Sequence, residues 1–468
     1  MLWPLLGARW LEPTLFGVMS VLVAWLLVLQ LLCGCGMNQA LVRFVPALAN
    51  SGAATIPLRL RFTVIAIPAL VAAAGWVVSM LWPGIRVPAV EAPLGWVVVG
   101  ALGLAYAYIF AGYWKATRRP ILGTLWGEVS IPLVFLGFVI WWSRMRGGTE
   151  SLESALLFTL AAWGAISLVL LLLFARGTGP GTEVPTTKSL GFSITPIRRW
   201  SFGAKAMATG LVYLGITVID RIMLGAWASL PEAGVYTLAA RGASALAIAV
   251  YVLAPVTGPH YAAHLGSAPS EALRLYQRTS AWVHEAILPL GLLLLFHARE
   301  ILVALGGEAY GEGATSLRVL TFGYLLVAGT GNNGLLLQMG GRENDELRLS
   351  GTALVLNVLL NLWAIPAYGM VGAAAATTFG LVTTTAFKVG LVKRVWGRWP
   401  VANFKPWLLL AALAWIAVEL IARSSTSGAS WIALALPPVA YVLVRLVPLR
   451  SGVGRSAWTV AGGPEGSS

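Results

Sequence analysis

Charged side chains are scarce in this sequence. Only 11% of its 468 residues are Asp, Glu, Lys or Arg, whereas soluble globular domains carry about 25%. Hydrophobic residues make up 58% of the chain, and the mean hydropathy is +0.80. These values exclude an ordinary soluble domain and predict a protein that crosses a membrane many times.

Cysteine and catalytic motifs are also nearly absent. Cys33 and Cys35 are the only cysteines; two residues apart on a predicted helix, they point in different directions and match no disulfide or metal framework. His260 and His264 have the spacing of metal ligands but no third ligand nearby. The sequence contains no P-loop, no nucleophile with a base and no paired-carboxylate hydrolytic site. We therefore expect no metal, no cofactor and no enzymatic activity.

Long apolar runs dominate what is present. Each is about long enough to cross ~30 Å of hydrocarbon as a helix. We predict an all-α membrane protein with about thirteen spans, near residues 14–35, 62–82, 94–114, 121–142, 154–175, 206–226, 235–257, 281–298, 317–339, 349–366, 371–392, 406–423 and 430–448. No cleavable signal peptide is evident, because Pro4, Gly7 and Arg9 interrupt the first residues.

The basic residues predict the orientation of the chain. When successive loops are assigned to alternate sides, roughly three quarters of the 32 lysines and arginines fall on one side. The positive-inside rule makes that side cytoplasmic, which places the C-terminus in the cytoplasm and the N-terminus outside. The net charge of +14 therefore reflects membrane orientation, and we expect no nucleic-acid partner.

A change in composition divides the chain. Residues 176–205 are rich in Gly, Pro and Thr and end in basic residues, which predicts a cytoplasmic linker. On either side we predict an N-lobe bundle over residues 1–175 and a C-lobe bundle over residues 206–394. Two extra helices over 395–450 and a disordered tail over 451–468 complete the expected organisation.

The two predicted lobes resemble each other in sequence. Residues 11–13 and 16–17 introduce the first span much as residues 230–232 and 234–236 introduce the seventh. Internal repeats of helical bundles around a central cavity are typical of transporters. A helix precedes the turn at Leu230 but none precedes Leu11, so we expect the chain to lack the first helix of its own repeat.

Charged residues stand inside the apolar hairpin of residues 216–241. If its first helix ends near Ala226 and its second begins near Gly234, Asp220 and Arg241 lie at the same depth, ~9–11 Å from the helix ends. We predict that these two residues pair, because intramembrane charges usually pair or face a wet cavity. Two interpretations remain open: a structural pair beside a snorkelling Arg221, or an aqueous substrate path lined by all three residues.

Other polar residues also lie within the predicted spans. Asn357 and Asn361 share one helical face and are expected to hydrogen-bond a neighbouring helix. Asn332 and Asn333 belong to a GTGNNG segment that predicts a local loosening of the ninth span beside a cavity. Glu128 and Glu419 are single carboxylates and candidates for proton coupling.

Four motifs resemble those of a known family. They are GMNQALVRFVP from Gly36, IDRIMLG from Ile219, PEAGVYTLAAR from Pro231 and NVLLNLWAIPAYGMVGAAAAT from Asn357. In this order and spacing they resemble the polysaccharide-biosynthesis flippases of the multidrug/oligosaccharidyl-lipid/polysaccharide exporter (MOP) superfamily. The resemblance implies a fourteen-helix pattern, of which the first helix is absent here, and export of undecaprenyl-pyrophosphate-linked oligosaccharide across the inner membrane.

The sequence thus predicts a flippase in which cationic cavity residues bind the lipid pyrophosphate while the glycan lies in an aqueous cavity. The candidate substrate-binding residues are Arg43, Asp220, Arg221, Arg241, Asn332 and Asn333. Proton or sodium coupling, and a polysaccharide polymerase and glycosyltransferases as partners, are compatible with this reading. Two alternatives stay open: a multidrug cation antiporter of the same superfamily, which needs a carboxylate-lined cavity, and a non-transporting membrane scaffold.

Overall fold

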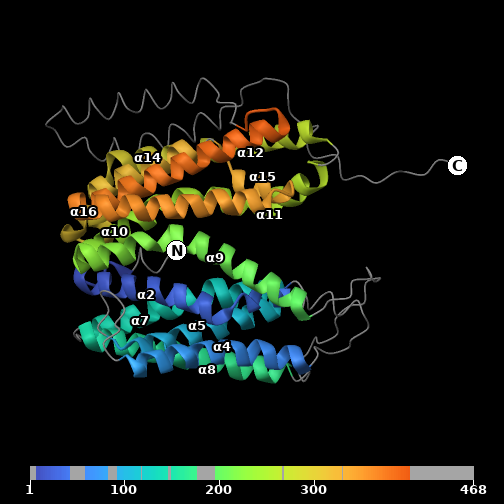
Figure 1. Cartoon of the computed structure of the whole chain (residues 1–468). Helices are drawn as coiled ribbons and strands as arrows, with labels where there is room; N and C mark the ends of the chain where they lie inside the picture. The colour runs from blue at the N-terminus through green and yellow to red at the C-terminus, as the bar shows by residue number, and fades with distance from the viewer. Residues whose placement is uncertain are drawn as a thin grey trace. The chain divides into compact units, whose positions relative to one another are not determined.

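The computed structural model of this protein describes residues 7–42, 58–82, 92–116, 119–145, 149–175, 196–265, 268–328 and 330–400. Within these ranges the regular structure is helical and contains no β-strand (Figure 1). The predicted all-α class is therefore confirmed. Most of the predicted linker, both predicted C-terminal helices, the predicted tail, Arg43 and Glu419 lie outside the described residues.

The first group of helices surrounds a buried central one. It consists of α2 (Pro13–Gly34), α4 (Leu58–Leu81), α5 (Leu94–Ala116), α6 (Pro120–Thr124), α7 (Ile131–Met145) and α8 (Thr149–Ala175). Helix α5 packs against α2, α4 and α8, and most of its residues are buried. A single π-helical segment, η1 (Leu125–Ser130), connects α6 to α7. These helices correspond to the first five predicted spans.

The second group contains longer and more broken helices. It consists of α9 (Pro196–Trp227), α10 (Leu230–Ser244), η2 (Ala245–Ala247), α11 (Ile248–His264), α12 (Pro269–Phe296), α13 (Ala298–Gly306), η3 (Glu308–Gly313), α14 (Ala314–Ala328), α15 (Asn333–Met339) and α16 (Glu343–Trp396). Ser229 caps the start of α10, because its hydroxyl accepts a hydrogen bond from the Glu232 backbone N–H (3.3 Å).

Helix α16 is a hairpin of two antiparallel helices joined at Gly369. Gly369 has φ +56° and non-helical ψ, a backbone conformation that favours glycine. The two halves are tied together by a hydrogen bond from the Asn357 amide to the Thr377 hydroxyl (3.1 Å). The spans predicted near 349–366 and 371–392 correspond to these halves.

Nine helices in the described ranges are long and apolar enough to cross a membrane, and α16 with its two halves is one of them. The ninth predicted span, near 317–339, is not continuous. Helix α14 ends at Ala328 and α15 begins at Asn333. The predicted loosening at GTGNNG is thus confirmed. Asparagine side chains there hydrogen-bond to the nearby backbone, which competes with the hydrogen bonds of a continuous helix.

The starts of α2 and α10 resemble each other and touch. Each helix has a proline in its first turn and a glycine as its fifth residue, Gly17 and Gly234. A Cβ atom on Gly17 would lie 1.8 Å from the Leu230 carbonyl oxygen, and one on Gly234 would lie 2.3 Å from the Pro13 carbonyl oxygen. Positions related by the predicted repeat therefore meet backbone to backbone. The division into two lobes itself remains a prediction.

Replacing Gly17 by alanine should destabilise the protein by about 1–3 kcal/mol, because the obstructing atoms belong to the backbone and cannot rotate aside. Thermal unfolding of the purified protein in detergent measures the effect. Gly34→Ala is the matched control, since a Cβ atom on Gly34 in the same helix meets nothing within 4 Å. Equal melting temperatures for the two variants would show that the backbone contact does not determine the packing of α2 on α10.

Candidate functional site

Three charged residues lie inside the helices of the second group. Asp220 and Arg221 are on α9 and are only 5% and 4% exposed. Arg241 is on α10 and is half-buried. Charges at such positions need a partner, a ligand or water, because transferring an unpaired charge out of water is costly.

The predicted ion pair between Asp220 and Arg241 is wrong. Asp220 Oδ2 instead accepts hydrogen bonds from the Tyr236 hydroxyl (2.6 Å) and the Thr377 hydroxyl (2.8 Å). No ion pair links the aspartate to an arginine in the part of the chain that the structure describes. The depth of a residue along a helix gives no information about its direction around the axis, and Thr377 lies on α16, outside the hairpin of residues 216–241.

The two arginines form no ion pair with a carboxylate among the described residues. Arg221 Nη2 donates to the Thr217 carbonyl oxygen of its own helix (2.5 Å). Arg241 Nε has no hydrogen-bond partner among the described residues. With one aspartate and two arginines, this cluster has a surplus of positive charge.

A chain of polar side chains extends from Asp220 into α16. Asn361 Nδ2 donates to Asn357 Oδ1 (3.0 Å), and Asn357 Nδ2 donates to the Thr377 hydroxyl (3.1 Å), which in turn donates to Asp220. The predicted interhelical hydrogen bonding of Asn357 is thus confirmed. Two acceptor atoms of the chain, Asp220 Oδ1 and Asn361 Oδ1, are buried without a partner in the described residues.

A cavity of about 370 Å³ lies among α9, α11, α12, α14, α15 and α16. Its lining combines aromatic rings with polar groups, including Tyr213, Tyr251, Tyr324, Asn332, Asn333, Gln338, Glu346 and Lys388. The structure thus brings Asn332 and Asn333 to this cavity. Asp220, Arg221 and Arg241 are not part of its described lining.

The break between α14 and α15 forms one wall of the cavity. Asn333 Oδ1 accepts from the Tyr276 hydroxyl (2.9 Å), and Asn333 Nδ2 donates to the Thr330 hydroxyl (3.0 Å). Both polar atoms of Asn333 are therefore engaged in stabilising the turn. Asn332 Oδ1 caps α15 by accepting from the Leu335 N–H (3.0 Å), which leaves its amide nitrogen without a bond in the described structure.

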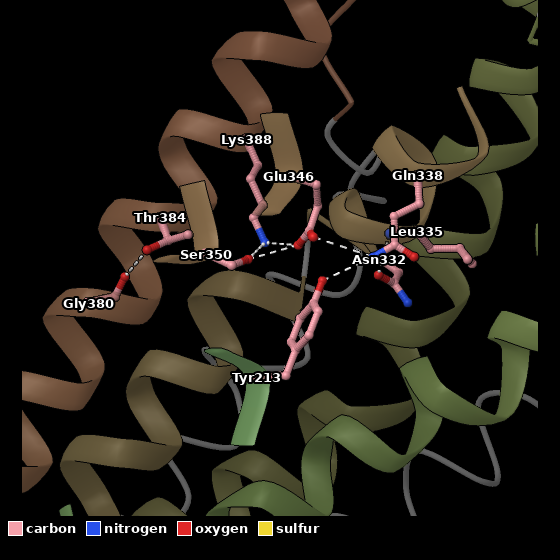
Figure 2. A network of polar contacts seen from close by, with 9 residues as sticks. All are labelled: Tyr213, Asn332, Leu335, Gln338, Glu346, Ser350, Gly380, Thr384 and Lys388. Carbon is pink, nitrogen blue, oxygen red and sulfur yellow. Dashed lines mark hydrogen bonds and ion pairs between the residues drawn. The ribbon is translucent and has the colours of Figure 1, made fainter. Parts of the chain in front are cut away.

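An ion-pair network lies beside this break and also lines the cavity (Figure 2). Lys388 Nζ lies 2.8 Å from Glu346 Oε1 and donates to the Ser350 hydroxyl (2.9 Å), which donates to the same carboxylate oxygen (2.8 Å). Gln338 Nε2 donates to Tyr213 Oη (3.0 Å) and approaches Glu346 Oε2 (3.4 Å). The Glu346 and Lys388 side chains are 1% and 14% exposed, so the pair is buried.

Sequence reasoning missed Glu346 and Lys388. The two residues lie at similar distances on either side of Gly369, so the depth argument applied to α16 would have paired them. Glu346 precedes the apolar run near 349–366, so hydropathy alone does not include it in a helix. The structure begins α16 at Glu343, because polar residues can extend a helix where they face a cavity.

The other polar residues considered in the sequence analysis form no site with the residues described above. Glu128 is on the π-helical segment η1 and forms an exposed ion pair with Lys115 (3.3 Å). Cys33 and Cys35 are free thiols, and His264 Nδ1 lies 2.9 Å from the His260 carbonyl oxygen. No group of three metal-ligating side chains occurs within the described ranges.

The fold is that of a class of membrane transporters. The chain is similar to the lipid II flippase MurJ in an inward closed conformation, with a TM-score of 0.62, 11% identity and coverage of 92% of this chain and 96% of that one. The chain is also similar to an inward-facing MATE family multidrug resistance transporter of the MOP superfamily, with a TM-score of 0.55, 13% identity and coverage of 84% of this chain and 93% of that one. For a Vibrio cholerae MATE transporter the TM-score is 0.50 and the identity 13%, with coverage of 84% of this chain and 96% of that one. At these identities the likeness establishes the fold.

Two sequence comparisons match parts of the chain. The family model described as polysaccharide biosynthesis protein matches residues 151–314. An uncharacterised membrane protein of Methanocaldococcus jannaschii is 24% identical over 109 residues, which is 23% of this chain and 22% of that protein, so the chain matches about a fifth of this relative's length. The motif-based resemblance to polysaccharide-biosynthesis proteins is thereby confirmed over the matched residues, and the fold resembles that of the MurJ and MATE transporters.

Proposed function

We propose that this protein is a flippase that moves an undecaprenyl-pyrophosphate-linked oligosaccharide from the cytoplasmic to the outer leaflet of the inner membrane. The observation that carries the proposal is the pair of arginines, Arg221 and Arg241, which form no ion pair in the described structure and whose two charges exceed the single charge of the neighbouring Asp220. Buried cations of this kind are stabilised when an anionic ligand arrives. A pyrophosphate suits them, because the planar guanidinium fork binds phosphate oxygens at two points.

The glycan and the polyprenyl tail of the substrate occupy different surroundings in this proposal. The glycan lies in an aqueous cavity and the polyprenyl tail remains in lipid. Rocking of the two repeats about the headgroup site provides alternating access. The excess of basic residues on one side supports a cytoplasmic linker and C-terminus, on the side where the lipid-linked substrate is assembled. Glycosyltransferases upstream and a polysaccharide polymerase downstream are the partners that this role requires.

The chain of polar groups around Asp220 supports cation coupling. Asp220 Oδ1 and Asn361 Oδ1 are buried acceptors without partners in the described structure, and hard cations such as sodium prefer carboxylate, amide and hydroxyl oxygens. A proton on the Asp220 carboxylate is the other candidate for the coupled ion.

Asp220→Asn should abolish the dependence of transport on the coupling ion, because it removes the carboxylate charge and keeps the shape of the side chain. Transport into vesicles is measured with a sodium gradient at constant pH and with a pH gradient at constant sodium. Loss of the response to one gradient identifies the coupled ion. An Asp220→Asn protein that responds to both gradients as the wild type does would exclude Asp220 from coupling.

Expression in a strain that lacks its own polysaccharide flippase tests the proposed function. Restored surface glycan, with no efflux of a quaternary-ammonium dye, is the expected result. Dye efflux without glycan would indicate the cation antiporter, and neither activity at normal abundance would indicate a scaffold. The structure disfavours the antiporter, because Glu346 is the only carboxylate in the described lining of the cavity and Lys388 neutralises it.

A further inference from the structure

The cavity among α9, α11, α12, α14, α15 and α16 has no surplus charge. Its described lining contains one carboxylate, on Glu346, and one cation, on Lys388, and the two are paired at 2.8 Å. Arg221 and Arg241 are absent from this lining. A pyrophosphate would find no free counterion here, so the charge pattern selects against the anionic headgroup and favours an uncharged ligand.

The aromatic part of the lining suits a ligand with an apolar face. Tyr213, Tyr251 and Tyr324 line the cavity, and Tyr251 is 64% exposed. The Tyr251 hydroxyl forms no hydrogen bond within the described ranges. Tyrosine combines an apolar ring with a polar tip, and a sugar ring likewise presents an apolar C–H face and an edge of hydroxyl groups.

The polar residues of the lining retain hydrogen-bond donors and acceptors that have no partner in the described structure. Lys388 uses two of its three ammonium hydrogens, on Glu346 and Ser350. The Gln338 carbonyl oxygen and the Asn332 amide nitrogen have no partner in the described structure, although their other polar atoms are fixed by Tyr213 and Leu335. These donors and acceptors are therefore oriented in advance, which reduces the cost of binding a hydroxylated ligand.

We propose that this cavity is a glycan subsite that binds an uncharged sugar residue of the lipid-linked substrate, separately from the arginines that bind its pyrophosphate. The volume of about 370 Å³ lies at the lower end of the range for small-ligand pockets, which suits a short piece of glycan. The proposal rests on the proposed flippase function and adds to it a second point of recognition.

Native mass spectrometry of the full chain in detergent tests the subsite. The probes are undecaprenyl pyrophosphate alone and the pool of lipid-linked oligosaccharides extracted from the source organism. The wild type should bind a lipid of the extracted pool more tightly than undecaprenyl pyrophosphate. Tyr251→Leu should reduce that preference about fivefold, because it removes the ring against which the apolar face of the sugar packs, and leave the affinity for undecaprenyl pyrophosphate unchanged.

Two further variants test whether the effect depends on the aromatic ring and on its position in the cavity. Tyr251→Phe retains the stacking surface and should keep most of the preference. Tyr368→Leu removes an equally exposed ring (62%) outside the described cavity lining and should keep all of it.

The outcomes separate the subsite from the flippase function. Equal affinity of the wild type for both probes, or an unchanged preference in Tyr251→Leu, overturns the subsite and leaves the flippase proposal standing. Failure of the wild type to bind either probe overturns the flippase proposal and the subsite with it. A loss that is equal for both probes in Tyr251→Leu also contradicts the subsite, because it shows a general defect rather than loss of sugar recognition.

Discussion

Lys388→Met should lower the free energy of unfolding by about 3–5 kcal/mol, the largest stability effect that we expect in this protein. The substitution removes the cation from the Glu346 carboxylate, which is 1% exposed, and leaves that charge buried with neutral partners alone, on Ser350, Gln338 and Tyr213. Unfolding of the purified protein in detergent, followed by tryptophan fluorescence, measures the change.

A double mutant and a surface control isolate the pair. Lys388→Met combined with Glu346→Gln should recover most of the lost stability, because removing both charges leaves neither one uncompensated. Arg394→Met removes an exposed cation from the same helix and should change stability by less than about 0.5 kcal/mol. If the double mutant is as unstable as Lys388→Met alone, the ion pair is not the source of the effect.

The second large effect concerns transport. Arg221→Gln combined with Arg241→Gln should reduce glycan export more than about tenfold while protein abundance stays near normal. Export falls because charge-assisted hydrogen bonds to phosphate are lost, each worth about 1.5–3 kcal/mol. Abundance is preserved because neither arginine has an ion-pair partner in the described structure that would be left unpaired. Surface glycan and membrane protein levels are measured in the same cells.

Arg299→Gln is the matched control for arginine loss. Arg299 forms an exposed ion pair with Glu308, with side chains 61% and 76% exposed, and such surface pairs contribute little. Its export should be unchanged. Normal export by the Arg221→Gln, Arg241→Gln double variant at normal abundance would assign both arginines to structure and remove the basis for a pyrophosphate site.

The helices could be predicted from the sequence because burial in lipid requires a run of apolar residues of fixed length. The halves of α16 and the break before Asn333 illustrate this, since both follow from local composition. The partner of Asp220 could not be predicted in the same way. Hydropathy fixes depth along a helix but not the direction in which Asp220 points, and its two hydrogen-bond donors come from two different helices.

The residues that line the cavity could be predicted from the sequence only in part. Asn332 was found because GTGNNG is unusual within an apolar run. Glu346 and Lys388 are unremarkable in sequence, since a carboxylate and an amine near helix ends are normally solvated. Only the antiparallel hairpin centred on Gly369 reveals that these residues face each other, 42 positions apart, in a buried network.

Transport by the purified full chain in proteoliposomes tests the central claim most directly. Lipid-linked oligosaccharide extracted from the source organism is incorporated into the vesicles, and a membrane-impermeant glycosidase added outside reports which glycans have crossed. The account predicts that the wild type exposes glycan to the enzyme much faster than protein-free vesicles do, and that the Arg221→Gln, Arg241→Gln double variant does not. A wild-type rate equal to that of protein-free vesicles would contradict it.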